Sequence, residues 1–312
     1  MGGTIKLVAT DLDGTLLDPS SCIPTRTRAA LCAARRAGIA VVPVTGRPPQ
    51  ALWPVVDGAE LGPLGVCSNG AVLVDIDAHE LLEVELIAAE VAVRLVADLR
   101  RVVPGIILAS DSLDGFYHES GFFDPPMGWT ERVTTVPDIL STTVAGCVKL
   151  IARRPGWSAP ELITALATDM AEEAHVTTSG LDWVDIGALG ITKAYAIERV
   201  CDRLGVSVAD VVAVGDNHND LSVLAWAGTA MAPANAIPAV LAVVDRVLPA
   251  NTEEGVAVLL EELVATRWSR PDCVTPRPQP PASGLRRSGP GGPVGGPTPT
   301  ARHRRPPRSG SG

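Results

Sequence analysis

The sequence predicts an α/β fold: a doubly wound parallel sheet covered by helices on both faces, with a second α+β unit inserted into it. Short, unbroken apolar runs alternate with amphipathic helical patterns. Such runs are typical of strands buried between two helix layers in a parallel sheet. Between about residues 82 and 185 the pattern changes to helices mixed with alternating or Thr/Val-rich segments. This change indicates a separate unit that is inserted into the parallel-sheet unit.

The first unit has four predicted strands and a well-delimited first helix. Gly38 follows the helix and suits a left-handed C-cap. Pro43 lies inside the second strand, where it would remove a hydrogen-bond donor from an interior strand. We retain the strand because its apolar run is otherwise unbroken. The predicted strands are residues 6–10, 40–44, 65–68 and 211–214, and the helix is residues 25–37.

The inserted unit, a predicted cap, spans residues 83–186. Residues 111–129 are interpreted as a long loop that holds all three phenylalanines of the chain. A long loop rich in aromatic side chains is typical of a functional segment, and it can equally just pack the unit. The other predicted elements are helices at residues 88–102 and 160–174 and strands at residues 105–110, 146–152, 175–179 and 182–186.

The remaining boundaries follow from composition. Residues 1–82 and 187–266 form the predicted catalytic core, and residues 267–312 form a tail rich in Pro, Gly, Arg and Ser. The tail cannot bury enough apolar surface to offset its ordering entropy, so we predict that it is disordered. Residues 271–312 hold seven Arg and one Asp, which leaves the rest of the chain at −15 within a total of −9. Nucleic acid is therefore not an expected partner.

Other bulk features exclude several classes of protein. The six cysteines are scattered and form no C-x-x-C pair, so neither a disulfide framework nor a structural zinc site is expected, and a reducing cytoplasm is the predicted location. No apolar stretch approaches the roughly 20 residues of a membrane span, and no leader pattern opens the sequence. No membrane partner is expected, and protein partners are not predicted.

The first chemical motif is VATDLDGTLLDPS, in which Asp11 and Asp13 follow an apolar run. At the end of a parallel strand the chain leaves the sheet, so both carboxylates can point into the crevice where such folds bind ligands. Two close carboxylates repel unless they share a divalent cation or divide the roles of ion and proton carrier. Taken alone, the segment is equally typical of an Asp-Gly turn.

Two further segments offer groups that bind anions. The run VPVTGRP brings together the Thr45 hydroxyl, the amides around Gly46 and the cation of Arg47, although T-G-R alone is typical of a turn. Later, Thr192 can cap a helix whose first turn holds Lys193. A cation there is unfavourable unless an anion lies in front of it, so Lys193 indicates a phosphate. In isolation it is equally typical of a surface lysine.

The fourth segment, VVAVGDNHNDLSVLAWAG, combines a buried strand, a glycine turn and a polar run that opens a helix. Several hard oxygen donors at one strand end suit Mg²⁺, which prefers carboxylates, water and phosphate to nitrogen or sulfur. His218 is interpreted as an exposed turn residue and not as a ligand. The polar run is Asp216, Asn217, His218, Asn219 and Asp220.

Together, these four segments resemble the motifs of the haloacid dehalogenase superfamily: D-x-D-G-T, T-G-R, a Lys near a helix start and G-D-x-x-N-D. The insertion between the second and third motifs resembles the C2 cap. Residues 68–71, Asn235 and residues 251–256 resemble the Cof-type subgroup. The resemblance covers residues 6 to about 263 and implies a parallel-sheet core with an inserted α+β cap.

The resemblance also implies roles. Asp11 would attack phosphorus and become a transient aspartyl phosphate, and Asp13 would protonate the leaving alkoxide and then activate water. Mg²⁺ is the implied cofactor, with Asp11, Asp216 and the backbone carbonyl of Asp13 as ligands, while Asp220 would orient metal waters or Lys193. Asp13 argues against dehalogenation, because members that cleave carbon–halogen bonds lack an acid there. The implied phosphate-binding residues are Thr45, Gly46, Lys193 and Asn219.

These features predict a Mg²⁺-dependent phosphatase of a small phosphomonoester, either a sugar phosphate or a phosphorylated cofactor. The first alternative is a phosphomutase or phosphotransferase, which passes phosphate to a sugar instead of water. A receiver-type domain is disfavoured by the insertion and the D-x-D spacing, and a catalytically silent binding protein by the intact acids. The predicted substrate contacts are Arg47 and Asn69 from the core and Phe116, Glu119 and Phe122 from the predicted loop.

Overall fold

The structure is a computed structural model of the 312-residue chain, and it describes residues 4–122, 133–143 and 145–268. The predicted tail lies outside the described residues from residue 269 onward, as do residues 123–129 of the predicted loop. Among the helices in the described ranges, none is both long enough and apolar enough to cross a membrane. The described residues up to Trp268 belong to one compact unit.

A five-stranded sheet, in which every neighbouring pair is parallel, forms the centre of the fold. Its first strand lies between the next strand along the chain on one side and a strand from a distant part of the chain on the other. The topology therefore reverses direction at this strand, which is where open α/β sheets bind ligands. The order is β14 (Arg246–Leu248), β13 (Thr229–Pro233), β12 (Val211–Val214), β1 (Leu7–Thr10) and β2 (Ala40–Pro43).

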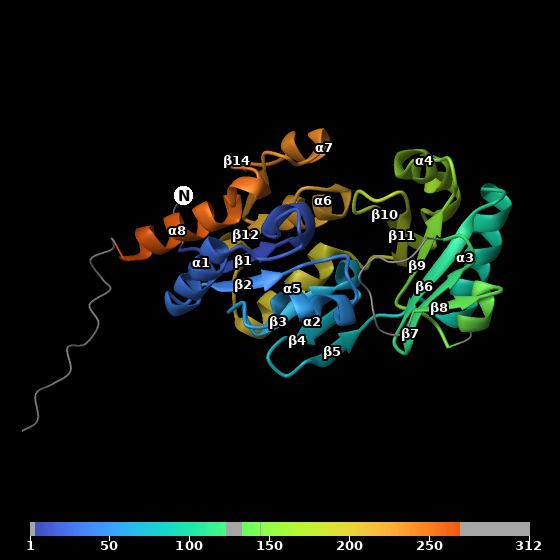
Figure 1. Cartoon of the computed structure of the whole chain (residues 1–312), viewed down its shortest axis with the longest axis horizontal. Coiled ribbons are helices and arrows are strands. Elements are labelled where there is room, and N and C mark those ends of the chain that lie inside the picture. Colours follow the sequence, from blue (N-terminus) through green and yellow to red (C-terminus); the bar gives the residue numbers. More distant parts are fainter. Residues whose placement is uncertain (1–3, 123–132, 144, 269–312) are drawn as a thin grey trace, which may run out of the picture. The chain divides into compact units, whose positions relative to one another are not determined.

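Helices cover both faces of this sheet, as Figure 1 shows. Successive residues of β1 alternate between them: Val8 packs in the same apolar cluster as α1 and α8, whereas Leu7 and Ala9 pack with α5 and α6. This alternation explains why the strands are apolar on both sides. The helices are α1 (Thr25–Arg36), α5 (Lys193–Leu204), α6 (Leu221–Trp226) and α8 (Gly255–Trp268); two short helices, α2 (Pro49–Val56) and α7 (Pro238–Leu241), complete this part.

The structure confirms the predicted C-cap and explains Pro43. Gly38 has a φ of +72°, the left-handed conformation that ends α1. β2 is the edge strand of the five-stranded sheet. The amides of Ala40 and Val44 donate to the carbonyls of Lys6 and Thr10, at 2.9 and 2.8 Å. Alternate amides of a strand point in opposite directions, so the missing amide of Pro43 would face away from β1 and costs no bond to it.

The third predicted strand, however, does not belong to the parallel sheet. β3 (Leu64–Cys67) pairs antiparallel with β4 (Val72–Asp75), which pairs with β5 (Glu80–Val84). A single parallel bridge, Val44 to Val66, links β3 to the residue that follows β2. The reason is the short connection between β3 and β4: a tight turn can join antiparallel strands, whereas parallel strands need a long crossover.

A six-stranded sheet lies between the two halves of this framework in the sequence, and we call residues 89–188 the inserted unit. Two helices, α3 (Ala89–Val102) and α4 (Ala159–Met170), pack on one face of the sheet through a shared apolar cluster. The division into core and cap domains remains a prediction. The strand order is β10 (Ala174–Thr177), β11 (Val184–Ala188), β9 (Lys149–Arg153), β6 (Ile107–Ser112), β7 (Gly115–Glu119) and β8 (Val133–Val136).

The prediction of a long loop at residues 111–129 is wrong in its first half. β6 and β7 form a hairpin in which Ser112 pairs with Gly115, so only two residues connect the strands. Phe116 and His118 are buried on one face of β7. The sequence contains a signal for this hairpin, the pair Asp114-Gly115. Asp-Gly between apolar segments is typical of a hairpin.

Candidate active site

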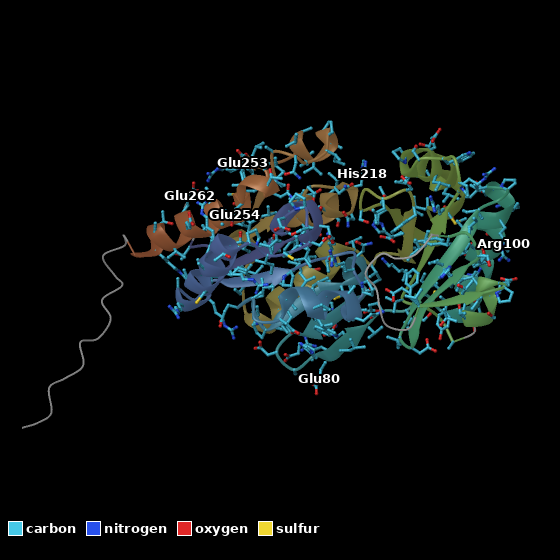
Figure 2. All side chains as sticks on the ribbon, in the orientation of Figure 1. Glu80, Arg100, His218, Glu253, Glu254 and Glu262 are labelled. Carbon is cyan, nitrogen blue, oxygen red and sulfur yellow. The ribbon has the colours of Figure 1, made fainter. Side chains whose placement is uncertain are left out.

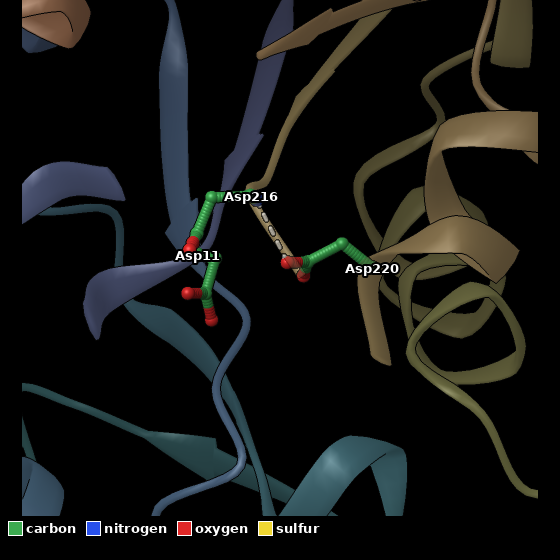
Figure 3. Close-up of side chains that lie close together, drawn as sticks. All are labelled: Asp11, Asp216 and Asp220. Atoms are coloured by element: carbon green, nitrogen blue, oxygen red, sulfur yellow. Dashed lines mark hydrogen bonds between the residues drawn. The ribbon is translucent and has the colours of Figure 1, made fainter. Parts of the chain in front are cut away.

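Three carboxylates meet at the carboxyl edge of the parallel sheet, where β1 and β12 end side by side (Figure 3). Asp11 follows β1 directly, and its amide donates to the carbonyl of Val214 at 2.9 Å. One carboxylate oxygen from each of Asp11, Asp216 and Asp220 lies within 4.8 Å of the others. All three side chains are buried. The sequence prediction that the first and fourth motifs converge therefore agrees with the geometry.

Gly14 and Thr15 bring the first motif onto Asp216. Gly14 has a φ of +80°, and a Cβ atom at this position would lie 2.6 Å from Asp216 Oδ2. Only glycine permits this approach without displacing the carboxylate. The next residue, Thr15, donates its hydroxyl to Asp216 Oδ1 at 2.7 Å. Sequence reasoning did not assign Thr15 a role, although its position in the D-x-D-G-T motif could have indicated one.

Lys193 is the cation of the site. It is the first residue of α5, and the hydroxyl of Thr192 accepts a hydrogen bond from the amide of Tyr195, as the predicted helix cap requires. Lys193 is 1% exposed, and its ammonium group donates to Asp11 Oδ1 and Asp220 Oδ1, both at 2.6 Å. Burial lowers the pKa of Lys193, but the charges of Asp11 and Asp220 outweigh it and the pKa is raised. The side chain is therefore a buried ammonium ion.

For Asp11 and Asp216, the effect of burial on the pKa outweighs that of the nearby opposite charge. Burial raises the pKa of Asp11 well above its ordinary value against the opposing charge of Lys193. Burial, together with the charge of Asp220, raises the pKa of Asp216 to about 6. If all three carboxylates ionise, the one ammonium leaves two negative charges uncompensated. Such a site gains stability from a divalent cation.

The chemistry of the donors fits Mg²⁺. Asp220 uses both oxygens within the protein: Oδ1 binds Lys193, and Oδ2 accepts the amides of Asp216 and Asn217 at 3.0 Å. Asp11 and Asp216 therefore offer the oxygens best placed for a metal ion, and Asp220 positions Lys193 and the Asp216 loop. Hard carboxylate oxygens are the ligands that Mg²⁺ prefers.

The predicted phosphate-binding residues lie at the same edge of the sheet. Thr45 is buried, and its hydroxyl accepts the amide of Arg47 at 3.1 Å. A Cβ atom on Gly46 would lie 3.1 Å from Asn69 Oδ1 and 3.7 Å from Asn219 Nδ2, so these three residues are adjacent. Asn219 donates to Asn69 at 3.0 Å, while its buried Oδ1 has no partner among the described residues. An unsatisfied buried amide oxygen at this position favours a group that donates a hydrogen bond to it.

Asp13 and Arg47 pair with each other. The guanidinium of Arg47 donates from Nε to Asp13 Oδ2 at 2.7 Å and from Nη2 to Oδ1 at 2.5 Å. The Asp13 side chain is 49% exposed, unlike the buried acids. Its carboxylate does not belong to the group of oxygens formed by the three buried acids. The structure thus places Asp13 at the rim of the site.

The three substrate contacts predicted from residues 111–129 stay predictions, and the structure places all three in the packing of the inserted unit. Phe116 and Phe122 are 2% and 0% exposed and pack against Ala109 and Ile151, so they present almost no surface to a ligand. Glu119 accepts a hydrogen bond from Arg100 of α3, which Figure 2 labels, at 2.5 Å. Its carboxylate also accepts backbone amides of the inserted unit. Glu119 therefore joins the sheet to its helix layer.

The structure adds Asp111, Lys149 and Asp185, which sequence reasoning missed, and groups them with Ser68 and the predicted contact Asn69. Side chains of the inserted unit bond to the loops after β2 and β3, and we call the five residues involved the polar cluster. Lys149 donates to Gly46 O at 2.9 Å and to Asp185 Oδ1 at 3.1 Å, and Asn69 donates to Asp185 Oδ2 at 2.9 Å. The sequence signal that could have identified them is a charged residue within an otherwise apolar strand. The polar cluster is Ser68, Asn69, Asp111, Lys149 and Asp185.

Asp111 makes the stability of the protein dependent on pH. It is 2% exposed and accepts the Ser68 hydroxyl at 2.8 Å, and burial raises its pKa to about 6. The pKa of Asp111 is higher in the folded state than in the unfolded state. Its contribution to the free energy of unfolding is therefore fully present below about pH 4 and is lost as the pH rises through about 6. We expect Asp111→Asn to remove this loss. The free energy of unfolding of the variant minus that of the parent should therefore be about 1–2 kcal/mol larger at pH 8 than at pH 5.

Urea unfolding of both proteins at the two pH values measures the effect. The matched control is Asp182→Asn, because the side chain of Asp182 is exposed. A pH-independent effect of Asp111→Asn would contradict the assignment of the raised pKa to this residue.

Comparison with known proteins agrees with the geometry. A family model described as haloacid dehalogenase-like hydrolase matches residues 8–260. The pyridoxal phosphate phosphatase YbhA of Escherichia coli is 29% identical over 267 residues, which is 81% of this chain and 97% of the relative. The 5-amino-6-(5-phospho-D-ribitylamino)uracil phosphatase YcsE of Bacillus subtilis is 27% identical over 260 residues, or 83% and 96% of the two chains.

Solved structures share the fold. A haloacid dehalogenase-like hydrolase from B. subtilis superposes with a TM-score of 0.72 at 22% sequence identity, covering 83% of this chain and 100% of the other. At this level of identity the likeness concerns the fold, and the site rests on the residues described above.

Proposed function

The chain belongs to the haloacid dehalogenase-like hydrolase family and is a phosphoric monoester hydrolase, and we propose that it hydrolyses a small phosphomonoester through a Mg²⁺-dependent aspartyl-phosphate mechanism. The observation that carries the proposal is the buried Lys193 ammonium, bonded to Asp11 and Asp220 beside Asp216. A carboxylate is a useful nucleophile toward an anionic phosphate only where cations offset the repulsion.

In the proposed reaction a carboxylate oxygen of Asp11 attacks phosphorus, and the alcohol leaves on the opposite side. Lys193 fixes the orientation of Asp11 and offsets the charge of the phosphoryl oxygens. The hydroxyl of Thr45, the amide of Gly46 and the side chain of Asn219 hold those oxygens. Mg²⁺, held by Asp11, Asp216 and the backbone carbonyl of Asp13, would neutralise charge on the phosphoryl group.

Asp13 is the proposed acid and base. It gives a proton to the leaving alkoxide, and then takes one from the water that hydrolyses the phosphoaspartate. In the structure its carboxylate is bonded to Arg47, so this ion pair has to open when Asp13 turns to the substrate. Arg47 is then free to contact the substrate, as the sequence predicts.

We expect Asp216→Asn to raise the Mg²⁺ concentration for half-maximal activity by at least about 10-fold, because one charged ligand becomes neutral. Phosphate release from p-nitrophenyl phosphate, titrated with Mg²⁺ after removal of metal with chelator, measures the change. Asp77→Asn is the control, since Asp77 is exposed and lies outside the site. An unchanged Mg²⁺ requirement in Asp216→Asn would exclude Asp216 as a ligand.

The same assay separates hydrolysis from phosphoryl transfer. A phosphatase releases one phosphate for each alcohol formed, whereas a mutase or transferase yields a phosphorylated product and little free phosphate. The relatives named above act on pyridoxal phosphate and on a phosphoribitylamino-uracil. They support a small phosphorylated metabolite as substrate, and a cytoplasmic location remains a prediction from the sequence.

A further inference from the structure

Two asparagines connect the loop after β1, residues 11–17, to segments near the C-terminal end of the described chain. Asn235 lies in the turn after β13, and its side-chain amide donates to the carbonyl of Gly14 at 2.8 Å. Asn251 lies in the turn after β14, and its side-chain amide donates to the carbonyl of Leu17 at 2.9 Å. We call these two residues the asparagine pair. They hold the loop after β1 at its middle and at its end.

The two members of the asparagine pair are bonded to each other. The backbone amide of Asn251 donates to Asn235 Oδ1 at 2.9 Å. A side-chain amide has an acceptor oxygen on one side and a donor nitrogen on the other, so this bond fixes which of them faces Gly14. Asn251 therefore orients Asn235 as well as holding Leu17.

The turn that carries Asn235 also holds the loop of Asp216. The amide of Ile237 donates to the backbone carbonyl of Asp216 at 3.0 Å. Residues 235–237 thus bind backbone carbonyls of both loops that supply the proposed Mg²⁺ ligands. Gly14 is the residue whose backbone lies against the Asp216 carboxylate. The carbonyl that Asn235 binds is therefore at the place where the two loops meet.

The carboxylates of these two loops repel each other. Asp11, Asp216 and Asp220 are buried close together (Figure 3), and the ammonium of Lys193 compensates only one of the three charges when all are ionised. Without a cation, the remaining repulsion favours movement of the loop after β1 away from Asp216. The hydrogen bonds of the asparagine pair oppose that movement because they hold the backbone of this loop.

Mg²⁺ makes the position of each ligand important. It requires nearly ideal octahedral geometry, so a small displacement of one oxygen weakens binding. The carbonyl of Asp13, a proposed ligand, lies one peptide unit before the Gly14 carbonyl that Asn235 binds. Groups that hold metal ligands from outside raise the affinity for the metal, because less ordering is required when it binds.

We propose that Asn235 and Asn251 are positioning residues for Mg²⁺, and that they hold the loop after β1 in the place where Asp11, Asp216 and the carbonyl of Asp13 meet one cation. The inference rests on the proposed Mg²⁺-dependent phosphatase function. Both asparagines act through the carbonyls of the loop and not by contact with the metal or the substrate.

The first test measures Mg²⁺ binding to the metal-free protein by isothermal titration calorimetry, without substrate. Asn235→Ala removes the bonds to Gly14 and Asn251, whereas Asn251→Ala removes only the bond to Leu17, because its backbone amide remains. We expect Kd for Mg²⁺ to rise by roughly 10-fold in Asn235→Ala and by roughly 3- to 5-fold in Asn251→Ala. Asn235 is exposed and Asn251 half-buried, so neither truncation opens a cavity in the apolar core.

The matched control is Thr252→Ala, because Thr252 is exposed on the same turn as Asn251. Its Kd should stay within about twofold of that of the parent.

The second test asks whether the loss acts through the metal. In phosphate release from p-nitrophenyl phosphate, the Mg²⁺ concentration for half-maximal activity should rise by about the same factor as Kd. At saturating Mg²⁺, kcat and the KM of the ester should stay within about twofold of the parent values. A residue that only stabilises the fold would leave Kd for Mg²⁺ unchanged.

An unchanged Kd in both variants would overturn the inference, and so would a fall in kcat that saturating Mg²⁺ does not restore. Failure of the proposed function has a different signature: the parent itself would bind no Mg²⁺ or would release no phosphate in its presence, and the inference would fail with it. A parent that binds Mg²⁺ and turns over, beside variants of parental affinity, would reject the inference alone.

Discussion

Asp11→Asn should lower kcat by about 10³-fold or more while the protein keeps its fold. An amide cannot form the acyl phosphate that the mechanism requires, and it is also a weaker ligand for Mg²⁺. The fold should survive because burial already raises the pKa of Asp11, so a neutral group of the same shape removes a buried charge. Lys193 keeps its second bond, to Asp220.

Steady-state phosphate release and urea unfolding measure the two halves of this prediction. Acid quenching during turnover adds a direct readout: the parent should carry an alkali-labile phosphate on the protein, and the variant should carry none. Asp182→Asn serves again as the exposed control. If Asp11→Asn hydrolyses the ester at the parent rate, Asp11 is not the nucleophile.

Lys193→Met should have the largest effect on stability, a loss of about 3–5 kcal/mol at pH 8 without metal. Methionine fills a similar volume but leaves Asp11, Asp216 and Asp220 buried without their cation. The pKa of Lys193 is raised in the folded state, so its contribution is fully present below its unfolded pKa and is present across pH 5–8. Without it the pKa values of Asp11 and Asp216 should rise further, so the loss should be smaller at pH 5 than at pH 8.

Urea unfolding in the presence of chelator at the two pH values measures this difference. Lys193→Met combined with Asp220→Asn should recover part of the stability, because one of the uncompensated carboxylates is removed, but none of the activity. Equal destabilisation at pH 5 and pH 8 would show that the lost contribution is packing and not charge, and it would contradict the proposed role of the ammonium.

Much of the candidate site could be predicted from the sequence because its signals are local. Asp11, Thr45 and Asp216 each follow an apolar strand, and parallel strands end at one edge of a sheet. The capped helix start at Thr192 likewise placed Lys193 toward an anion site. The strand β12 and the left-handed cap at Gly38 depend on their own neighbours, and both agree with the prediction.

Strand register accounts for what the sequence analysis missed. Glu119 and His118 are adjacent in β7, yet Glu119 faces α3 and His118 lies on the opposite face because β6 and β7 pair as they do. A shift of one residue would exchange them. Lys149 and Asp185 could be recognised as neighbours only after β9 and β11 were aligned.

By itself, the amino-acid sequence determined the kind of fold and the strand ends that carry polar residues, and it indicated the reaction proposed above. These depend on apolar periodicity, caps and short motifs, which act over a few residues. Only the tertiary structure decided that Asp220 uses both oxygens within the protein, that Asp13 pairs with Arg47, and that Asn235 and Asn251 bond to the loop after β1. Those outcomes depend on distances between segments far apart in the chain, and packing sets those distances.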